Sequence, residues 1–152
     1  MIETLTIAIG ADHGGVHMKT RLATALRDAG HEVLDFGTDG PASVDYPDFA
    51  QAVCAAVAQK RAAYGVLVCG TGIGMSIAAN RNPAIRCGLV HDVTTARLTR
   101  AHNDANVLAL GARIIGEEVA LDILAAFLGT TFEGGRHERR LSKLNKTTEP
   151  TP

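Results

Sequence analysis

The sequence predicts an α/β fold, a Rossmann-like three-layer sandwich in which a mostly parallel five-stranded sheet carries helices on both faces. This prediction rests on two observations. Short apolar segments alternate with helical patterns from one end of the chain to the other, and repeated strand–helix units build a parallel sheet between two layers of helices. In addition, residues 66–69 form an almost continuous apolar run, which is typical of a strand buried on both faces.

The expected strands are short runs rich in apolar residues. The first ends at Gly10, and the third passes directly into a glycine-rich loop. A turn-rich stretch over residues 37–47 follows the second. The strands are predicted over residues 5–9, 32–35, 66–69, 87–90 and 107–110.

Helices are expected between these strands and after the last one. Met18, Leu22 and Leu26 recur at helical spacing, and Gly30 suits the end of that helix. Similar patterns predict further helices over residues 49–57, 76–80, 94–101, 119–127 and 137–144.

Length and composition suit one compact domain. The chain has 152 residues, of which 46% are hydrophobic, and this excludes a disordered chain. We expect residues 1–145 to form the domain and the Thr/Pro-rich residues 146–152 to form a flexible tail. The net charge of −1 argues against nucleic acid as a partner, and no apolar stretch is long enough for a membrane span. With no visible signal peptide, the expected location is the cytoplasm.

The three cysteines indicate neither a disulfide framework nor a metal site. Cys54, Cys69 and Cys87 are odd in number and lack CxxC spacing, and no HExxH motif occurs, so no metal is expected. Cys54 and Cys87 are interpreted as core residues. Cys69 stands where a buried strand meets a glycine-rich loop, and there a thiol can serve as a base or nucleophile. An inert core cysteine is the alternative interpretation.

That loop has a glycine at every second position between a strand and a helix, in the run Gly70-Thr71-Gly72-Ile73-Gly74. Its backbone amides can cradle an anion, although a packing turn is the alternative. The loop is neither a dinucleotide fingerprint nor a P-loop. Ligands bind at the carboxyl ends of such strands, and Asp12 and His13 leave the first strand at this same edge.

A basic segment lies near the C-terminus, with five basic residues and one acidic residue between positions 136 and 146. Arg136 and Arg140 are four residues apart and therefore share a helix face, which suits a phosphate group. A solvated helix face is the alternative. His137 points elsewhere on an ideal helix, and we interpret it as a solvated residue.

The position of His102 has a geometric consequence. His102 precedes the fifth strand, so it is expected at the amino ends of the strands, opposite the Cys69 loop. Within one chain the two residues should not meet. A site that used both residues would therefore be completed across a dimer interface, with His102 and Asn103 contributed by the partner.

Together these motifs resemble ribose-5-phosphate isomerase type B. The resemblance runs from Thr6 to Arg140, and its order and spacing are specific. The wider family also includes galactose-6-phosphate isomerase subunits and isomerases of allose or tetrulose phosphates. The matching segments are GADH (10–13), DYP (45–47), CGTGIGMSIAAN (69–80), HNDANVL (102–108), GAR (111–113) and FEGGRH (132–137).

The resemblance implies an aldose–ketose isomerase that works through a cis-enediol(ate), needs no metal or cofactor, and forms a homodimer with shared sites or a tetramer. Some family members have Ser at the position of Cys69 and a Glu base at that of Met75, so this chain resembles the cysteine-base group. The implied roles are a base for Cys69; ring opening for His102, assisted by Thr71; an anion hole from the amides of Gly70, Thr71, Gly72, Ile73 and Gly74; hydroxyl contacts for Asn103; positions near the sugar for Asp12 and His13; and phosphate binding for Arg113, Arg136 and Arg140.

The expected reaction interconverts ribose 5-phosphate and ribulose 5-phosphate. The same chemistry on a four- or six-carbon sugar phosphate is the alternative within the enzyme class. A non-catalytic sugar-phosphate-binding domain is the alternative from another class, and it is disfavoured because binding alone needs no base. A flavodoxin-like carrier is disfavoured too, since the chain has two Tyr and no Trp to stack on a flavin.

Overall fold

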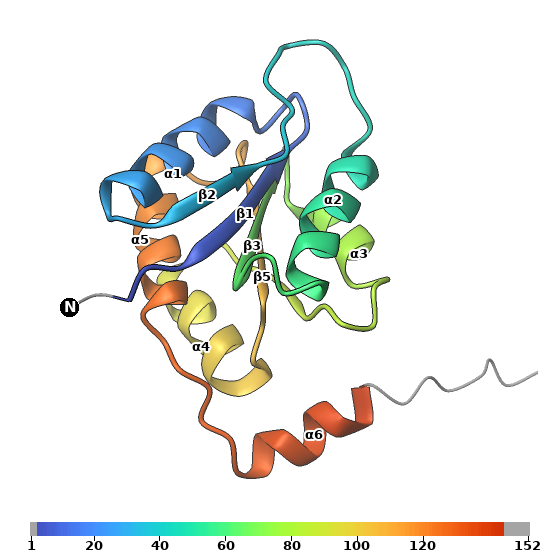
Figure 1. Cartoon of the computed structure of the whole chain (residues 1–152), viewed down its shortest axis with the longest axis vertical. Coiled ribbons are helices and arrows are strands. Elements are labelled where there is room, and N and C mark those ends of the chain that lie inside the picture. Colours follow the sequence, from blue (N-terminus) through green and yellow to red (C-terminus); the bar gives the residue numbers. More distant parts are fainter. Residues whose placement is uncertain (1–2, 145–152) are drawn as a thin grey trace, which may run out of the picture.

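An all-parallel sheet of five strands forms the centre of the structure (Figure 1). The computed structural model describes residues 3–144. Within them, the predicted α/β sandwich with helices on both faces of the sheet is confirmed. The strands are β1 (Thr6–Ala11), β2 (Glu32–Asp35), β3 (Tyr64–Cys69), β4 (Cys87–Leu89) and β5 (Val107–Gly111). The helices are α1 (Val16–Asp28), α2 (Tyr46–Ala58), α3 (Ile73–Ala79), α4 (Val93–Asn103), α5 (Glu117–Leu128) and α6 (Arg136–Leu144).

The strand order is β2-β1-β3-β5-β4, which places β3 in the middle of the sheet. Because all pairs are parallel, every strand ends at one edge, called here the carboxyl edge, and begins at the other, the amino edge. Ala11 of β1 lies opposite Val68, and Gly111 of β5 lies opposite Cys69. The loops that leave β1, β3 and β5 therefore emerge side by side.

Side chains of β3 alternate between two hydrophobic cores. Val66 and Val68 pack in the core under α1, α4 and α5, whereas Leu67 and Cys69 pack in the core under α2 and α3. This alternation follows from the two-residue period of a strand. It places the thiol of Cys69 on the side of the sheet that α2 and α3 cover.

The helices that follow β1 and β3 cover opposite faces of the sheet. Helix α1 lies on one face and α3 on the other, while α5, which follows β5, returns to the face of α1 (Figure 1). Chain segments that diverge in this way open a crevice at the carboxyl edge, and ligands bind in such crevices. The chain leaves β3 toward one face of the sheet, whereas it leaves the neighbouring strands β1 and β5 toward the other face. The topology therefore predicts that a ligand binds at the end of β3.

Two helix boundaries differ from the predicted ones in ways that affect the site. Helix α3 begins at Ile73 rather than near residue 76, because Gly72 takes the left-handed conformation (φ +77°) that starts it. Helix α4 continues to Asn103, so His102 lies in its last turn rather than in a loop. Asp104, with φ +45°, ends that helix.

The end of α4 is fixed by the buried side chain of Arg100. Its Nη1 donates to Oδ1 of Asp104 (2.8 Å) and to the carbonyl of Ala105 (2.7 Å). The guanidinium also lies over the rings of Tyr64 (5.0 Å) and Phe127 (5.8 Å). A buried charge needs such partners, and together they hold the last turn of α4 against the core.

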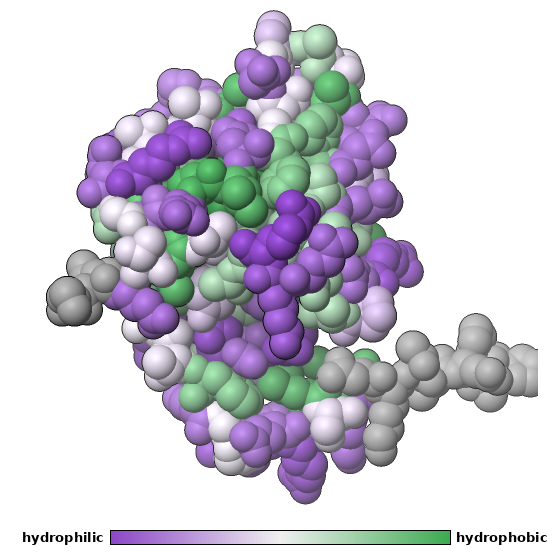
Figure 2. Space-filling view, viewed as in Figure 1, coloured by the Kyte–Doolittle hydropathy of each residue, from purple (hydrophilic) through white to green (hydrophobic). Residues whose placement is uncertain are grey.

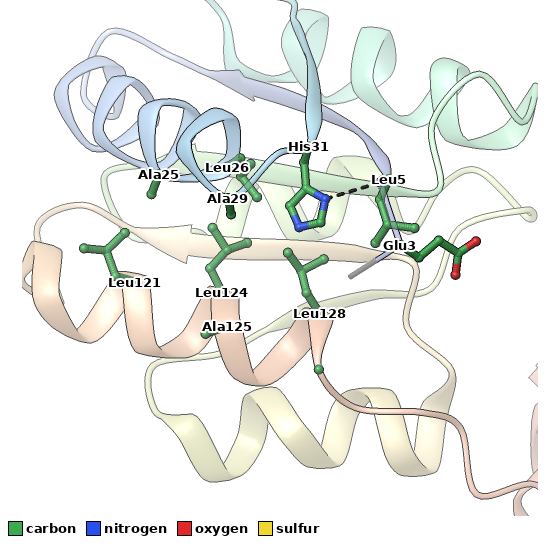
Figure 3. A pocket seen from close by; sticks show the side chains of 11 residues that line it. Glu3, Leu5, Ala25, Leu26, Ala29, His31, Leu121, Leu124, Ala125 and Leu128 are labelled. Atoms are coloured by element: carbon green, nitrogen blue, oxygen red, sulfur yellow. Dashed lines mark hydrogen bonds between the residues drawn. The ribbon is translucent and has the colours of Figure 1, made fainter. Parts of the chain in front are cut away.

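An apolar cavity of about 450 Å³ lies between α1 and α5 near the start of β1 (Figure 3). Leu26, Leu121, Leu124 and Leu128 line it, and His31 Nδ1 accepts a hydrogen bond from the Leu5 amide (3.2 Å). The cavity lies at the amino edge, because Leu5 precedes β1. It is therefore separate from the loop that follows β3.

Helix α6 lies beyond the amino edge and packs against α4 (Figure 1). Figure 2 shows apolar atoms where this end of the chain faces the rest of the molecule and hydrophilic atoms on its outer side. Between residues 3 and 144, no helix has the length and apolar character that a membrane crossing requires. The tail predicted over residues 146–152 lies outside the described residues.

Candidate active site

Cys69 is the last residue of β3, and one backbone amide donates a hydrogen bond to its sulfur. The residue is 5% exposed, and its Sγ accepts a hydrogen bond from the Gly72 amide (3.2 Å). Its carbonyl accepts from the Ala112 amide (2.9 Å), which ties the end of β3 to the exit of β5. A negative charge that develops on this sulfur would be met by an amide donor already in place.

The shape of the glycine-rich loop requires a glycine at position 72. Gly72 has a φ of +77°, and a Cβ there would lie 2.6 Å from Leu89 Cδ1 and 2.9 Å from the Leu110 carbonyl carbon. Both the conformation and the packing therefore require glycine. The tight turn points the first amides of α3 toward the crevice; the Ile73 amide donates to Thr71 Oγ1 (3.2 Å). The other amides in the first turn of α3 have no carbonyl partner within the helix, so they can bind an anion.

Asp12 and His13 stand beside this loop at the end of β1. Asp12 Oδ1 accepts from the Gly14 amide (2.9 Å), and a Cβ on Gly14 would lie 3.6 Å from the Gly70 nitrogen, so the two loops are in contact. His13 Nδ1 accepts from the Val44 amide (3.2 Å). This bond leaves the Nε2 of His13 as the atom available to a ligand.

Arg113 completes the carboxyl edge from the side of β5. Its amide donates to the Gly70 carbonyl (2.9 Å), and a Cβ on Gly70 would lie 3.5 Å from the Nε of Arg113. The guanidinium stem therefore lies against the glycine-rich loop. The structure thus brings together nine predicted residues: Cys69, Thr71, Asp12, His13, Gly70, Gly72, Ile73, Gly74 and Arg113.

The other four predicted residues lie at the amino edge, away from this group. His102 and Asn103 belong to the last turn of α4, and Arg136 and Arg140 are exposed on α6. Figure 1 shows α4 and α6 as neighbours at this end of the molecule. The expectation that Cys69 and His102 do not meet within one chain agrees with this placement, because α4 ends where β5 begins. One chain therefore presents two halves of the predicted site at opposite edges of the sheet.

The interpretation of His137 as a solvated residue was wrong. Its side chain is 6% exposed, and its ring stacks on that of His102 with centroids 4.4 Å apart and planes 13° apart. Glu133 Oε2 lies 3.4 Å from His137 Nε2 and 3.8 Å from His102 Nε2. The i,i+4 spacing of Glu133 and His137 is visible in the sequence, but only packing of α6 on α4 brings His102 to them.

Cys54 and Cys87 pack in or against the α2/α3 core, as predicted. Burial raises the pKa of the Cys54 thiol to about 11. Burial, together with the neighbouring Cys54, raises the pKa of Cys87 well above the ordinary range of a thiol. Both groups are therefore neutral near pH 7, which suits packing and not catalysis.

Comparison with known proteins matches nearly the whole chain to one family. The sequence profile of a family described as Ribose/Galactose Isomerase matches residues 7–144. Ribose-5-phosphate isomerase B of Escherichia coli (strain K12) is 44% identical over 138 residues, which are 91% of this chain and 93% of that protein. D-erythrulose-4-phosphate isomerase of Pectobacterium atrosepticum is 40% identical over 141 residues, 92% of this chain and 93% of that protein.

The fold also matches that of a solved structure. Ribose-5-Phosphate Isomerase B of Clostridium thermocellum superposes with a TM-score of 0.93 at 48% sequence identity, covering 93% of this chain and 96% of that one. At this identity and coverage the likeness includes the sequence as well as the fold.

We predict that an alkylating reagent modifies Cys69 before Cys54 and Cys87 in the folded protein. With a pKa near 11, only about one Cys54 thiol in a thousand is ionised at pH 8, and the thiolate is the reactive form. Iodoacetamide treatment at pH 8 followed by peptide mass spectrometry measures the order of labelling. The same treatment in urea serves as the control, in which all three thiols should react. Equal labelling of Cys54 and Cys69 without urea would contradict the assignment of Cys69 as the reactive thiol.

Proposed function

The chain belongs to the ribose/galactose isomerase family, and from that premise we propose that it interconverts ribose 5-phosphate and ribulose 5-phosphate. It is an aldose–ketose isomerase of sugar phosphates. The observation that carries the proposal is the thiol of Cys69, which stands at the end of β3 with the Gly72 amide on its sulfur.

The proton transfer follows from this geometry. As thiolate, Cys69 removes the proton from C2 of the open-chain aldose, and the electron pair forms the C1–C2 double bond while charge develops on O1. The same sulfur returns the proton to C1, and the hydroxyl proton of O2 moves to O1, which leaves the ketose. Amides of the Gly70–Gly74 loop that are not bonded to Cys69 or Thr71 stabilise the enediolate, and one such donor contributes on the order of 3 kcal/mol to a transition state.

The ring form of the substrate must open before this step. In our proposal His102 of a second copy donates and accepts the proton at the ring oxygen, with Thr71 Oγ1 assisting and Asn103 binding sugar hydroxyls. Asp12 and His13 hold the hydroxyls near the reacting end. A positioned acid/base group of this kind contributes roughly 100- to 10,000-fold to the rate.

The phosphate group is assigned to arginines. Arg113 lies beside the glycine-rich loop, and Arg136 and Arg140 are exposed on one face of α6. Guanidinium groups bind phosphate through paired hydrogen bonds. Because Arg136 and Arg140 share the amino edge with His102, a partner that supplies the imidazole to the crevice also supplies these two groups.

An exposed apolar face supports a second copy at this position. Ile73 and Ile77, four residues apart on α3, are 51% and 52% exposed, and Tyr46 of α2 is 39% exposed beside them. Exposed apolar groups clustered in this way favour an interface between protein chains. The face borders the glycine-rich loop, so a partner that covers it reaches the crevice. We propose a homodimer with two shared sites, with a tetramer as the alternative.

A four- or six-carbon sugar phosphate remains the second candidate substrate. The observation that favours it is the 40% identity to a D-erythrulose-4-phosphate isomerase. Both candidates use the same thiol and the same amides, so they differ only in the length of sugar that fits between Cys69 and the arginines.

We predict that ribose 5-phosphate has the highest kcat/KM among aldose phosphates of four, five and six carbons. The reason is that phosphate binding orients the reacting end, and a chain of another length displaces C2 from the sulfur. Steady-state rates on the three substrates measure this order. A higher kcat/KM for a four- or six-carbon substrate would contradict this prediction and identify that sugar phosphate as the preferred substrate.

We predict that Cys69→Ala lowers kcat by roughly 100- to 10,000-fold because the base is removed. Cys87→Ala is the matched control and should retain activity, since Cys87 lies outside the crevice. Calorimetric titration with inorganic phosphate tests whether the Cys69→Ala protein still binds the anion, as we expect. Turnover by Cys69→Ala at the rate of the unmodified protein would exclude Cys69 as the base.

We predict that inactive Cys69→Ala and His102→Ala homodimers regain activity when their subunits exchange. Each heterodimer then holds one site with both groups intact, so random exchange should restore about a quarter of the unmodified rate. Heterodimers are confirmed by native mass spectrometry with one protein isotope-labelled. Confirmed heterodimers without activity would argue that each site uses Cys69 and His102 of the same chain.

A further inference from the structure

Three side chains meet where α6 packs on α4, and one of them, His102, is distant in the sequence from the other two, Glu133 and His137. His102 belongs to the last turn of α4, Glu133 precedes α6, and His137 lies in its first turn. The Glu133 amide donates to the Ala101 carbonyl (3.0 Å), and the His137 amide donates to that of Gly134 (3.1 Å). These backbone bonds hold the three side chains at one place even though α6 makes few other contacts.

The Nε2 atom of His137 is buried without a hydrogen-bond partner among residues 3–144. The nearest carboxylate oxygen, Oε2 of Glu133, lies at 3.4 Å, which is too long for a good hydrogen bond. Buried polar atoms are almost always paired, and an orphaned one requires an explanation. This atom lies on the side of the ring that faces Glu133, and Glu133 Oε2 lies 3.8 Å from His102 Nε2.

The two separations from Glu133 Oε2 are close to those around a metal ion of the zinc class, and His102 has to move toward the other two side chains for all three to bind one ion. With bonds of about 2.0–2.1 Å, two ligands of a tetrahedral zinc ion lie about 3.4 Å apart. The observed separations from Glu133 Oε2 are 3.4 and 3.8 Å, and all three ligand atoms lie within 4.8 Å of one another. Two imidazoles and one carboxylate favour zinc and similar transition metals over magnesium or calcium, which prefer oxygen.

We propose that His102, Glu133 and His137 bind a divalent cation of the zinc class, and that this cation withdraws His102 from catalysis. His137 is buried and fixed, whereas the side chain of His102 is 35% exposed and can tilt out of the stack toward Glu133. The exposed side of the cluster leaves a fourth position for water.

The regulatory part of this inference rests on the proposed function, in which His102 opens the sugar ring. An imidazole nitrogen that binds a metal ion has no lone pair for a proton. A cation on Nε2 of His102 therefore removes this nitrogen from proton exchange at the ring oxygen and slows ring opening, while Cys69 and its loop at the carboxyl edge are unchanged. Removing the cation with a chelator frees the imidazole.

Calorimetric titration with zinc chloride, in a buffer that does not bind metal, tests the site. We expect one zinc ion per chain in the unmodified protein and an affinity at least about 10-fold lower in Glu133→Gln and His137→Gln. His17→Gln is the matched control: His17 pairs with Glu117 (2.6 Å) as an exposed two-ligand site, so its loss should not change the titration. Cys69→Ala should also bind zinc normally, which excludes the thiol as the ligand.

Equal zinc affinity in the unmodified protein, Glu133→Gln and His137→Gln would overturn the site, as would no binding at all. Glu133 is exposed, so its variant remains informative if His137→Gln does not fold. Zinc should slow ribose 5-phosphate turnover reversibly, and Glu133→Gln, compared with its own metal-free rate, should need at least about 10-fold more zinc. Zinc that binds without slowing turnover would overturn the regulatory part. A protein inactive on every sugar phosphate but with the expected zinc titrations would retain the site and reject the proposed function.

Discussion

The arrangement of the whole site depends on one constraint, the parallel direction of all five strands. In such a sheet every strand ends at the same edge, so the thiol of Cys69, the loop amides and Arg113 must share that edge. The helix that leads into β5 must then end at the opposite edge, and it carries His102 with it. No adjustment of side chains within one chain can remove this separation. In the shared site that we propose, His102 of one chain reaches the Cys69 loop of the other chain, so the separation within each chain does not prevent the reaction.

Each half of the proposed site is held in place by packing contacts and hydrogen bonds that take no part in the proposed reaction. At the carboxyl edge, Gly72 packs against Leu89 and Leu110 so closely that the loop has one shape, and that shape directs an amide at Cys69 Sγ. At the amino edge, Arg100 binds Asp104 and Ala105 and fixes the last turn of α4. Preorganised donors are effective because no energy is spent on aligning them during the reaction.

Much of the fold, and the position of Cys69 in it, could be predicted from residue patterns. The alternation of apolar segments and helices predicted the sandwich, and the run before the glycine-rich loop predicted that Cys69 ends a buried strand. Spacing could not locate His137, because a helical repeat shows which residues share a face but not which face another helix covers. The start of α3 and the last turn of α4 also differed from prediction, since Gly72 before α3 and Asp104 after α4 take left-handed conformations.

The sequence by itself determined the order of strands and helices, the position of the glycine-rich loop after a buried strand and the edge on which Cys69 and His102 each lie. These follow from local periodicity and from the direction of a parallel sheet, which need no knowledge of long-range contacts. Only the tertiary structure decided that His137 is buried against His102 and Glu133 and that Ile73 and Ile77 are left exposed. Contacts between segments far apart in the chain decide both, because burial depends on which surfaces meet.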